Sequence, residues 1–314
     1  MANNKTRSGY GLHIQRIKTF HTVAMIIAAA FLVIMPVPFI LRLKNRNEGE
    51  RSELLRLWEA GEIEQVFNTS GKALSSQPMD YFLLTIHGFA AYQLGISQIN
   101  AHDTGVFIDE CIRSLRKAML LENAAKDGRV YYVLGKAYTY KGDAYADLAV
   151  QYLEKARSLS YDAADIPEYL GLAYAAVGDY RNSVAAFSLA LEPVSGSAPS
   201  DTLLLSIARS YLALEKLDAA RAYLLRCIEV SSDSNTVLAA RFLLVEISVK
   251  AGDSEEAENQ LMTILDETGG NAEAHYRLGE LYALRGDTTK ARSEWRLALR
   301  ADPAHAKARE RLNI

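Results

Sequence analysis

The 314-residue chain contains few cysteines and few prolines. Its two cysteines, Cys111 and Cys227, stand far apart, so a disulfide framework is not indicated and cysteine usage does not identify the compartment. Both occupy positions where a small apolar residue would suit a core, and we expect two buried thiols. Only seven prolines and no low-complexity run argue against a disordered chain.

The short signatures of common catalytic and metal sites are also missing. The chain has no H-E-x-x-H, no G-x-S-x-G and no phosphate-binding G-x-x-x-x-G-K-[ST] motif. His102 is followed by Asp103, but two such groups are too few for a metal or catalytic site. We therefore expect no enzyme activity, no cofactor and no metal.

An excess of basic charge is missing as well. The whole chain has a net charge of −3, and the residues after position 41 carry 31 basic and 38 acidic groups. This balance lacks the electrostatic footprint of a nucleic-acid-binding protein. The segment 285–311 is locally basic, which we interpret as a solvated face, with an acidic partner or a lipid headgroup as the alternative.

One long uncharged stretch is present, at residues 19–41. A helix of this length, at about 1.5 Å per residue, crosses a hydrocarbon core of about 30 Å. A cleaved signal peptide is the alternative, but its apolar region is usually shorter, and no A-x-A-like site follows this one. We expect a basic N-terminal tail at 1–18 and an uncleaved transmembrane helix at 19–41.

The orientation of this span depends on the charges that flank it. Four basic residues precede it and four follow it, so the positive-inside rule does not decide: Lys5, Arg7, Arg16 and Lys18, then Arg42, Lys44, Arg46 and Arg51. A short tail ahead of a first span usually stays inside. This favours a single-pass protein of the inner membrane, with the rest of the chain in the bacterial periplasm. The opposite orientation would make it a cytoplasmic adaptor or import receptor.

The rest of the chain is organised around recurring Gly-Asp pairs. Around Gly286-Asp287 the flanking residues follow L-G-x-x-Y upstream and A-x-x-x-aromatic-x-x-A, then Pro, downstream: Leu278, Gly279, Tyr282, Ala291, Trp295, Ala298 and Pro303. Each set falls on one face of a helix. Gly286 suits a left-handed stop of the first helix, and Asp287 suits the cap of the second. The pattern therefore predicts two antiparallel helices joined by a tight turn.

The same frame recurs along the chain at Gly135, Gly171, Ala208 and Gly252, and less clearly at Gly61 and Gly88. This pattern resembles the tetratricopeptide repeat (TPR), a unit of about 34 residues. The resemblance covers about residues 47–305 and implies an all-α, right-handed superhelical solenoid of six to seven helix pairs. Residues 305–314 are predicted to form a capping helix.

Two departures from the frame fall in turns. About 11 residues, Ile96 to Val106, are in excess between the helices of one unit, and we expect an expanded turn there that could bind a partner. Simple tolerance of extra length is the alternative. Two further residues, Ala144 and Tyr145, lengthen another turn and should expose the tyrosine.

In the family that the chain resembles, the first helix of each unit lines a concave groove. Mapping the groove positions onto this sequence gives the candidate partner-binding residues Phe89, Tyr92, Tyr132, Lys136, Glu168, Leu172, Arg209, Phe242, Glu246, Tyr276 and Glu280. Their mixed aromatic, aliphatic and charged character suits an extended peptide or a helix. The alternative is that some of them only pack between repeats. The Lys/Asn clamp of chaperone-binding members is absent from these positions, so binding of chaperone C-termini is not expected.

The sequence thus predicts a non-enzymatic, membrane-tethered scaffold for protein–protein interactions, part of a multiprotein complex of the bacterial envelope. A flagellar-motor or collar component is one specific form of this hypothesis. Two alternatives remain open. One is a periplasmic chaperone or adaptor associated with a translocase, and the other is the regulatory subunit of an enzyme.

Overall fold

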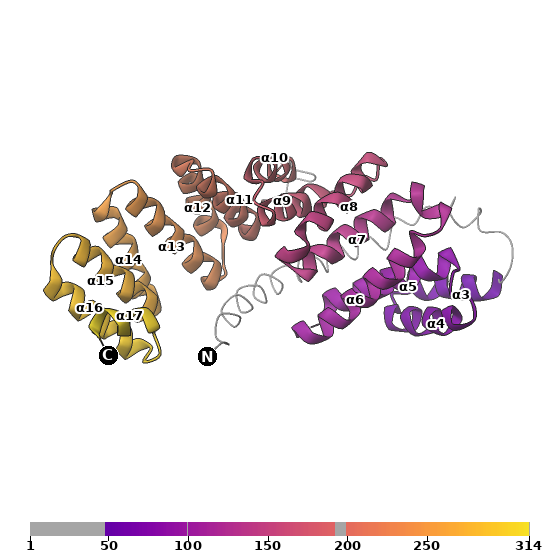
Figure 1. The fold of residues 1–314 in the computed structure, drawn as a ribbon, viewed down its shortest axis with the longest axis horizontal. Helices are drawn as coiled ribbons and strands as arrows, with labels where there is room; N and C mark the ends of the chain where they lie inside the picture. The colour runs from indigo at the N-terminus through magenta and orange to yellow at the C-terminus, as the bar shows by residue number, and fades with distance from the viewer. Residues whose placement is uncertain (1–47, 99, 192–198, 314) are drawn as a thin grey trace. The chain divides into compact units, whose positions relative to one another are not determined.

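The computed structural model of the protein describes residues 48–98, 100–191 and 199–313. Within these ranges it contains fifteen α-helices, two short 3-10 helices and no strand (Figure 1). The predicted all-α class is therefore confirmed. The predicted tail at 1–18 and transmembrane helix at 19–41 lie outside the described residues. Among the residues described, no helix is both long enough and apolar enough to span a bilayer.

The chain divides into two compact units. The described part of unit 1 is residues 48–191, and it contains α3 (Glu48–Glu59), α4 (Ile63–Ser76), α5 (Tyr81–Ser97), α6 (Ala101–Ala118), α7 (Gly128–Lys141), α8 (Ala146–Ser158), α9 (Ile166–Ala176) and α10 (Tyr180–Ala190). Its 3-10 helices are η1 (Glu122–Lys126) and η2 (Asp143–Tyr145).

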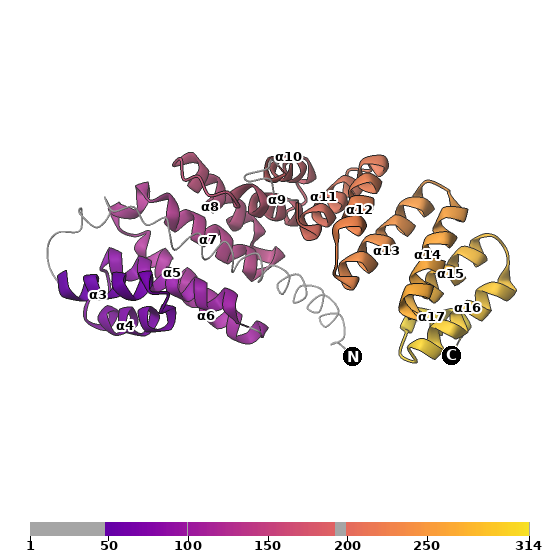
Figure 2. The same cartoon turned by 180° about the vertical axis from the view of Figure 1, so that it is seen from behind.

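The described part of unit 2 is residues 199–313. It contains α11 (Asp201–Ala213), α12 (Leu217–Val230), α13 (Ser234–Lys250), α14 (Ser254–Thr268), α15 (Ala272–Leu284), α16 (Thr288–Ala301) and α17 (Ala306–Leu312). Figure 2 shows the same helices from behind.

Helices α3 to α16 form seven consecutive pairs, each a first helix and a second helix. The predicted turn chemistry is confirmed in three of them. Gly178, Gly252 and Gly286 have φ of +83°, +77° and +81°, a left-handed conformation that glycine adopts without strain. The aspartate after each glycine caps the second helix; Asp287 Oδ1, for example, accepts from Lys290 N at 2.9 Å. A Gly-Asp dipeptide therefore ends one helix and starts the next.

Within a pair, the two helices pack closely where the first helix has a glycine and the second has a large side chain. A Cβ added to Gly171 would lie 2.4 Å from Phe187 Cδ1, and one added to Gly279 would lie 2.5 Å from Trp295 Cδ1. Both aromatic rings therefore pack directly against the backbone of the glycine in the first helix. The predicted face of Ala291, Trp295 and Ala298 is buried, as the spacing required.

First helices of neighbouring pairs contact one another within each unit. In unit 1, α5 contacts α7 and α7 contacts α9; in unit 2, α11 contacts α13. Helix α5 is buried on nearly all sides and has no Asp, Glu, Lys or Arg. This row of first helices is the surface on which the resemblance places the groove.

The expected expanded turn at 96–106 is wrong. Helix α5 continues to Ser97 and α6 begins at Ala101, so most of the extra residues lengthen the two helices. Asn100 caps α6 by accepting from Asp103 N at 2.9 Å, and α6 contains no proline that would interrupt it. The lengthened turn after Gly142 is present as η2, and Tyr145 is exposed there as predicted.

Both cysteines are free and buried, as expected. At the C-terminal end, α17 occupies the residues assigned to a capping helix, and its Ala308 and Leu312 pack on the cluster that contains Trp295. Its charged residues Lys307, Arg309, Glu310 and Arg311 are exposed.

Candidate functional site

A buried polar cluster lies among the first helices of unit 1. The amine of Lys136, on α7, donates to Asp165 Oδ2 at 2.7 Å and to the hydroxyl of Tyr132 at 2.9 Å. The Tyr132 hydroxyl in turn donates to the same carboxylate, at 2.7 Å from Oδ1. The side chains of Lys136 and Asp165 are only 8% and 6% exposed. We call these residues, with Tyr92, Tyr140, Glu168 and Tyr169, the Lys136 cluster.

Three tyrosine rings surround the amine. Its Nζ lies 4.5 Å from the ring centroid of Tyr169, 4.8 Å from Tyr132 and 5.5 Å from Tyr92. Aromatic faces attract a cation, and the effect strengthens away from water. The rings come from α5, α7 and α9, so the amine joins three successive first helices.

Asp165 has an unusual role for its position. It is the N-cap residue of α9, yet its side chain makes no capping hydrogen bond. The N-cap side chains of the other first helices from α5 to α15 all accept a backbone N–H: Asp80, Asp127, Ser200, Asp233 and Asn271. A capping bond contributes about 1 kcal/mol. The carboxylate of Asp165 instead binds Lys136 and Tyr132 in the neighbouring pair.

Glu168 lies in the first turn of α9, beside this ion pair. Its side chain is half-buried, and burial raises its pKa to about 7, with repulsion from Asp165 adding to the shift and Lys136 opposing it. The charge of Glu168 also contributes to the raised pKa of Tyr140, about 12, whose first cause is burial. The hydroxyls of Tyr92 and Tyr140 are buried in the same cluster. The cluster therefore places a carboxyl group with a raised pKa beside a buried ion pair.

The predicted binding residues of unit 1 separate into two groups. Phe89, Tyr92, Tyr132 and Lys136 are buried, and the amine of Lys136 is held by Asp165. Their role in partner binding stays a prediction, beside the alternative that they only pack between repeats. Glu168 and Leu172 are half-buried on the same row, in α9. The structure brings Tyr92, Tyr132, Lys136 and Glu168 together through one cluster.

The predicted residues of unit 2, Arg209, Phe242, Glu246, Tyr276 and Glu280, are all half-buried. The guanidinium of Arg277 lies 4.8 Å above the ring of Phe242, and Glu246 pairs with Lys250 at 3.1 Å. Tyr276 and Glu280 contact the C-terminal helix α17 and its N-cap residue. Arg311 pairs with Glu280, and the ring of His305 lies 5.1 Å from that of Tyr276.

Asp165, Tyr140 and Tyr169 were not among the residues predicted for the site. Tyr132 and Asp165 are 33 residues apart, which is close to one repeat length, and that separation brings equivalent ends of adjacent first helices together. A tyrosine and a lysine one turn apart on a first helix, with an aspartate about one repeat after the tyrosine, is thus a signal that could have revealed the cluster.

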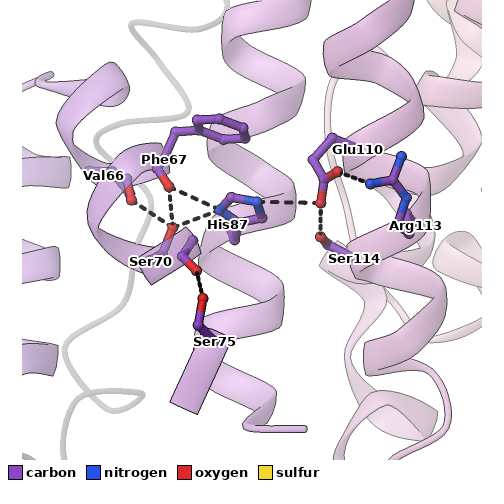
Figure 3. Close-up of polar contacts among 9 residues, drawn as sticks. Val66, Phe67, Ser70, Ser75, His87, Glu110, Arg113 and Ser114 are labelled. Carbon is purple, nitrogen blue, oxygen red and sulfur yellow. Dashed lines mark hydrogen bonds and ion pairs between the residues drawn. The ribbon is translucent and has the colours of Figure 1, made fainter. Parts of the chain in front are cut away.

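A second polar network in unit 1 has the composition of a catalytic triad, but its geometry is structural (Figure 3). His87 Nδ1 lies 2.9 Å from Ser70 Oγ, and His87 Nε2 lies 3.4 Å from Glu110 Oε1. However, Ser70 is fully buried and its hydroxyl donates to Val66 O at 2.6 Å. The ring of His87 also stacks on Phe67, with centroids 4.4 Å apart. The network joins α4, α5 and α6, and no substrate can reach its hydroxyl.

His102 is exposed and Asp103 is part-exposed in the first turn of α6, where Asp103 accepts from Asn100 Nδ2 at 2.6 Å. Among the residues that the structure describes, no group of three or more His, Cys, Asp or Glu side chains is placed to hold a metal ion.

Comparisons with known proteins agree with this architecture. Two tetratricopeptide-repeat family models match residues 202–234 and 242–306. No curated protein sequence matches the chain significantly.

Among solved structures, the C-terminal part of a TPR repeat-containing protein from Cytophaga hutchinsonii is similar, with 14% identity and a TM-score of 0.58 over 84% of this chain and all of that one. PilW, a type IV pilus biogenesis factor, has 17% identity and a TM-score of 0.55 over 72% of this chain and 98% of its own. Identities this low establish the fold alone. Residues 202–234 and 242–306 therefore match tetratricopeptide repeats, and the chain has the all-α fold of paired helices seen in solved structures of such repeats.

Proposed function

We propose that the protein is a membrane-tethered scaffold that holds a partner protein on the first helices of unit 1, as part of a bacterial envelope complex. Tetratricopeptide repeats are a protein-interaction architecture, and the uncharged stretch at 19–41 supports the tether. A flagellar-motor or collar assembly is one form that such a complex could take.

The observation that carries this proposal is the Lys136 cluster. A buried ion pair is often no better for stability than an apolar core of the same volume, because both charges lose their hydration. Here one carboxylate also gives up a helix cap to make the pair. The arrangement joins three first helices and leaves Glu168 and Leu172 part-exposed on α9. Such a fixed surface suits an extended segment or a helix of a partner.

Site-specific photocrosslinking in native membranes tests the proposal. A photoreactive amino acid at Leu172, on first helix α9, should give one dominant crosslinked product. The same group at Leu189, 49% exposed on second helix α10, should give little. Equal yields at both positions would contradict a first-helix binding face. Many unrelated products at Leu172 would indicate a chaperone that binds clients without fixed stoichiometry.

The tether needs a separate experiment. The full chain should remain in the membrane after alkaline carbonate extraction, and a variant without residues 1–41 should be released. A reporter fused after Ile314 should be active in its periplasmic form and inactive in its cytoplasmic form. Release of the full chain would contradict the tether, and the opposite reporter result would place the repeats in the cytoplasm.

A further inference from the structure

The charged residues on the first helices of unit 1 are few, and most have a partner. Helix α5 has no Asp, Glu, Lys or Arg. On α7, Arg129 pairs with Asp127 at 2.7 Å, Lys136 pairs with Asp165, and Lys141 pairs with Asp109 at 2.7 Å. Glu168 is the one charged residue within α9. The row α5, α7 and α9 is therefore close to neutral apart from this single carboxyl group.

Glu168 has no ion-pair or hydrogen-bond partner among the described residues, although it is half-buried. The nearby cation, Lys136, is occupied by Asp165 and by the hydroxyl of Tyr132. A carboxylate that is removed from water without a partner is unfavourable, and proteins normally satisfy such groups.

The chemistry of the missing partner can be derived from these charges. The site presents one anionic group, Glu168, that has no partner of opposite charge among the described residues, and the tyrosine rings beside it already hold the amine of Lys136. An acidic or phosphorylated partner would meet repulsion from Glu168 and Asp165. A guanidinium or an ammonium group would supply the donors that a carboxylate accepts.

We propose that Glu168 anchors a basic side chain, arginine or lysine, of the protein segment that binds across α7 and α9. This inference rests on the proposed function and names the chemistry of its partner. Leu172 lies one turn further along α9, so the residue of the partner next to the basic one should be apolar.

The state of Glu168 makes this recognition depend on pH. Its pKa of about 7 is set first by burial, then by repulsion from Asp165 and by attraction to Lys136. The other groups that face the site from α5 and α7 are Tyr92, Tyr132 and Tyr140, whose raised pKa values keep them neutral. If only the ionised carboxylate binds the cation, the affinity should rise about tenfold between pH 6 and pH 8.

Peptide selection on the full chain, kept in a mild detergent, tests the proposal. A phage-displayed library of random 12-residue peptides is selected on the protein at pH 8, in parallel with Glu168→Gln and with Glu64→Gln, an exposed carboxylate on α4, as the matched control. The natural chain and Glu64→Gln should enrich peptides that share one Arg or Lys position. Glu168→Gln should lose that position. Glutamine has nearly the same shape, and circular dichroism checks that the fold is kept.

Calorimetric titration of an enriched peptide then measures the anchor directly. Glu168→Gln, or replacement of the basic residue of the peptide by glutamine, should each weaken binding at least tenfold at pH 8. The two changes together should weaken it little further. The pH dependence should disappear in Glu168→Gln.

The possible failures are distinguishable. If the natural chain enriches no peptide, the proposed function fails and this inference fails with it. If peptides are enriched without a shared basic position, or bind Glu168→Gln equally well at every pH, only the basic anchor is contradicted. In that case the first-helix surface still binds a partner through other groups.

Discussion

Units 1 and 2 use the same helix-pair frame but differ in where they place charge. In unit 1 the first helices bury an ion pair inside a ring of tyrosines, whereas in unit 2 the ion pairs that involve predicted groove residues lie at the surface. Gly171 and Gly279 nevertheless carry the same close helix contact in both units. The difference shows that the frame depends on small residues and turns, and that the first helices can vary without disturbing it.

The same contrast appears in the family comparison. Both matching family models fall within unit 2, at 202–234 and 242–306. Unit 1 departs from the family pattern in its long helices α5 and α6 and in its buried polar residues. A region that departs from a common pattern while keeping the common fold is where we expect the specific function of this chain.

The largest expected effect comes from breaking the buried ion pair. Lys136→Met should leave Asp165 and the Tyr132 hydroxyl without their cation and destabilise unit 1 by about 3–5 kcal/mol. The matched change in unit 2, Lys250→Met, removes the partner of Glu246 at the surface and should change stability by less than about 1 kcal/mol.

The two tryptophans allow each unit to be followed separately in urea. Trp58 belongs to unit 1 and Trp295 to unit 2, and both are buried. In a Trp295→Phe background the fluorescence reports unit 1, and in a Trp58→Phe background it reports unit 2. Equal shifts of the two transitions would show that the Lys136 cluster is no more important for stability than a surface pair.

The glycine contacts should respond alike in the two units. Gly171→Ala and Gly279→Ala place a Cβ within 2.5 Å of Phe187 and Trp295, and each should destabilise its own unit by about 1–3 kcal/mol. Gly105→Ala on α6 meets nothing within 4 Å and should stabilise unit 1 by about 0.5–1 kcal/mol, since alanine favours a helix. Urea unfolding followed by Trp58 fluorescence for unit 1 and Trp295 fluorescence for unit 2 measures these changes. A tolerated Gly279→Ala would contradict the close packing on which the frame depends.

The turns and the close contacts could be predicted because each depends on residues near in sequence. Gly286 and Asp287 act on their own neighbours, and Trp295 meets Gly279 sixteen positions earlier in the same helix pair. The turn at 96–106 was mispredicted because a family spacing was imposed on a segment whose own residues allow a helix. The helix-forming tendency of these residues determined their structure, and the repeat spacing of the family did not.

The candidate site was harder to predict because it depends on residues one repeat apart. Lys136 was placed in a groove from its position in its own helix, but Asp165, 29 residues later, brings it inside. Glu168 is half-buried, as a residue that lines a groove can be. Its raised pKa and its lack of a partner among the described residues depend on Asp165 and Lys136, which come close to it only in the folded chain. A single repeat read by itself could not show these features.

The stability of unit 1 should depend on pH through Glu168. Its pKa in the folded chain, about 7, exceeds the ordinary value of 4.5, so folding favours the protonated form. The resulting penalty is absent below about pH 4.5, grows as the pH rises and is complete above about 7. Glu168→Gln should therefore stabilise unit 1 by about 1–2 kcal/mol at pH 8, less than the full shift implies because the side chain is part-exposed, and by little at pH 5. Urea unfolding at both values measures this, and a pH-independent difference would contradict it.

The smallest effect tests the one hairpin turn of unit 2 that lacks its glycine. Glu215 has φ of +57°, at the position where Gly252 and Gly286 stand in the next two pairs, and its side chain is exposed. Residues with a Cβ are strained in this conformation by about 1 kcal/mol, and asparagine tolerates it better than most. Glu215→Gly should stabilise unit 2 by up to about 1 kcal/mol, and Glu215→Asn by less, in thermal unfolding followed through Trp295. A loss of stability on replacement by glycine would mean that the glutamate contributes more than the strain it introduces. This turn of unit 2 would then depend on the side chain of Glu215, just as the contacts among the first helices of unit 1 depend on the side chains of the Lys136 cluster.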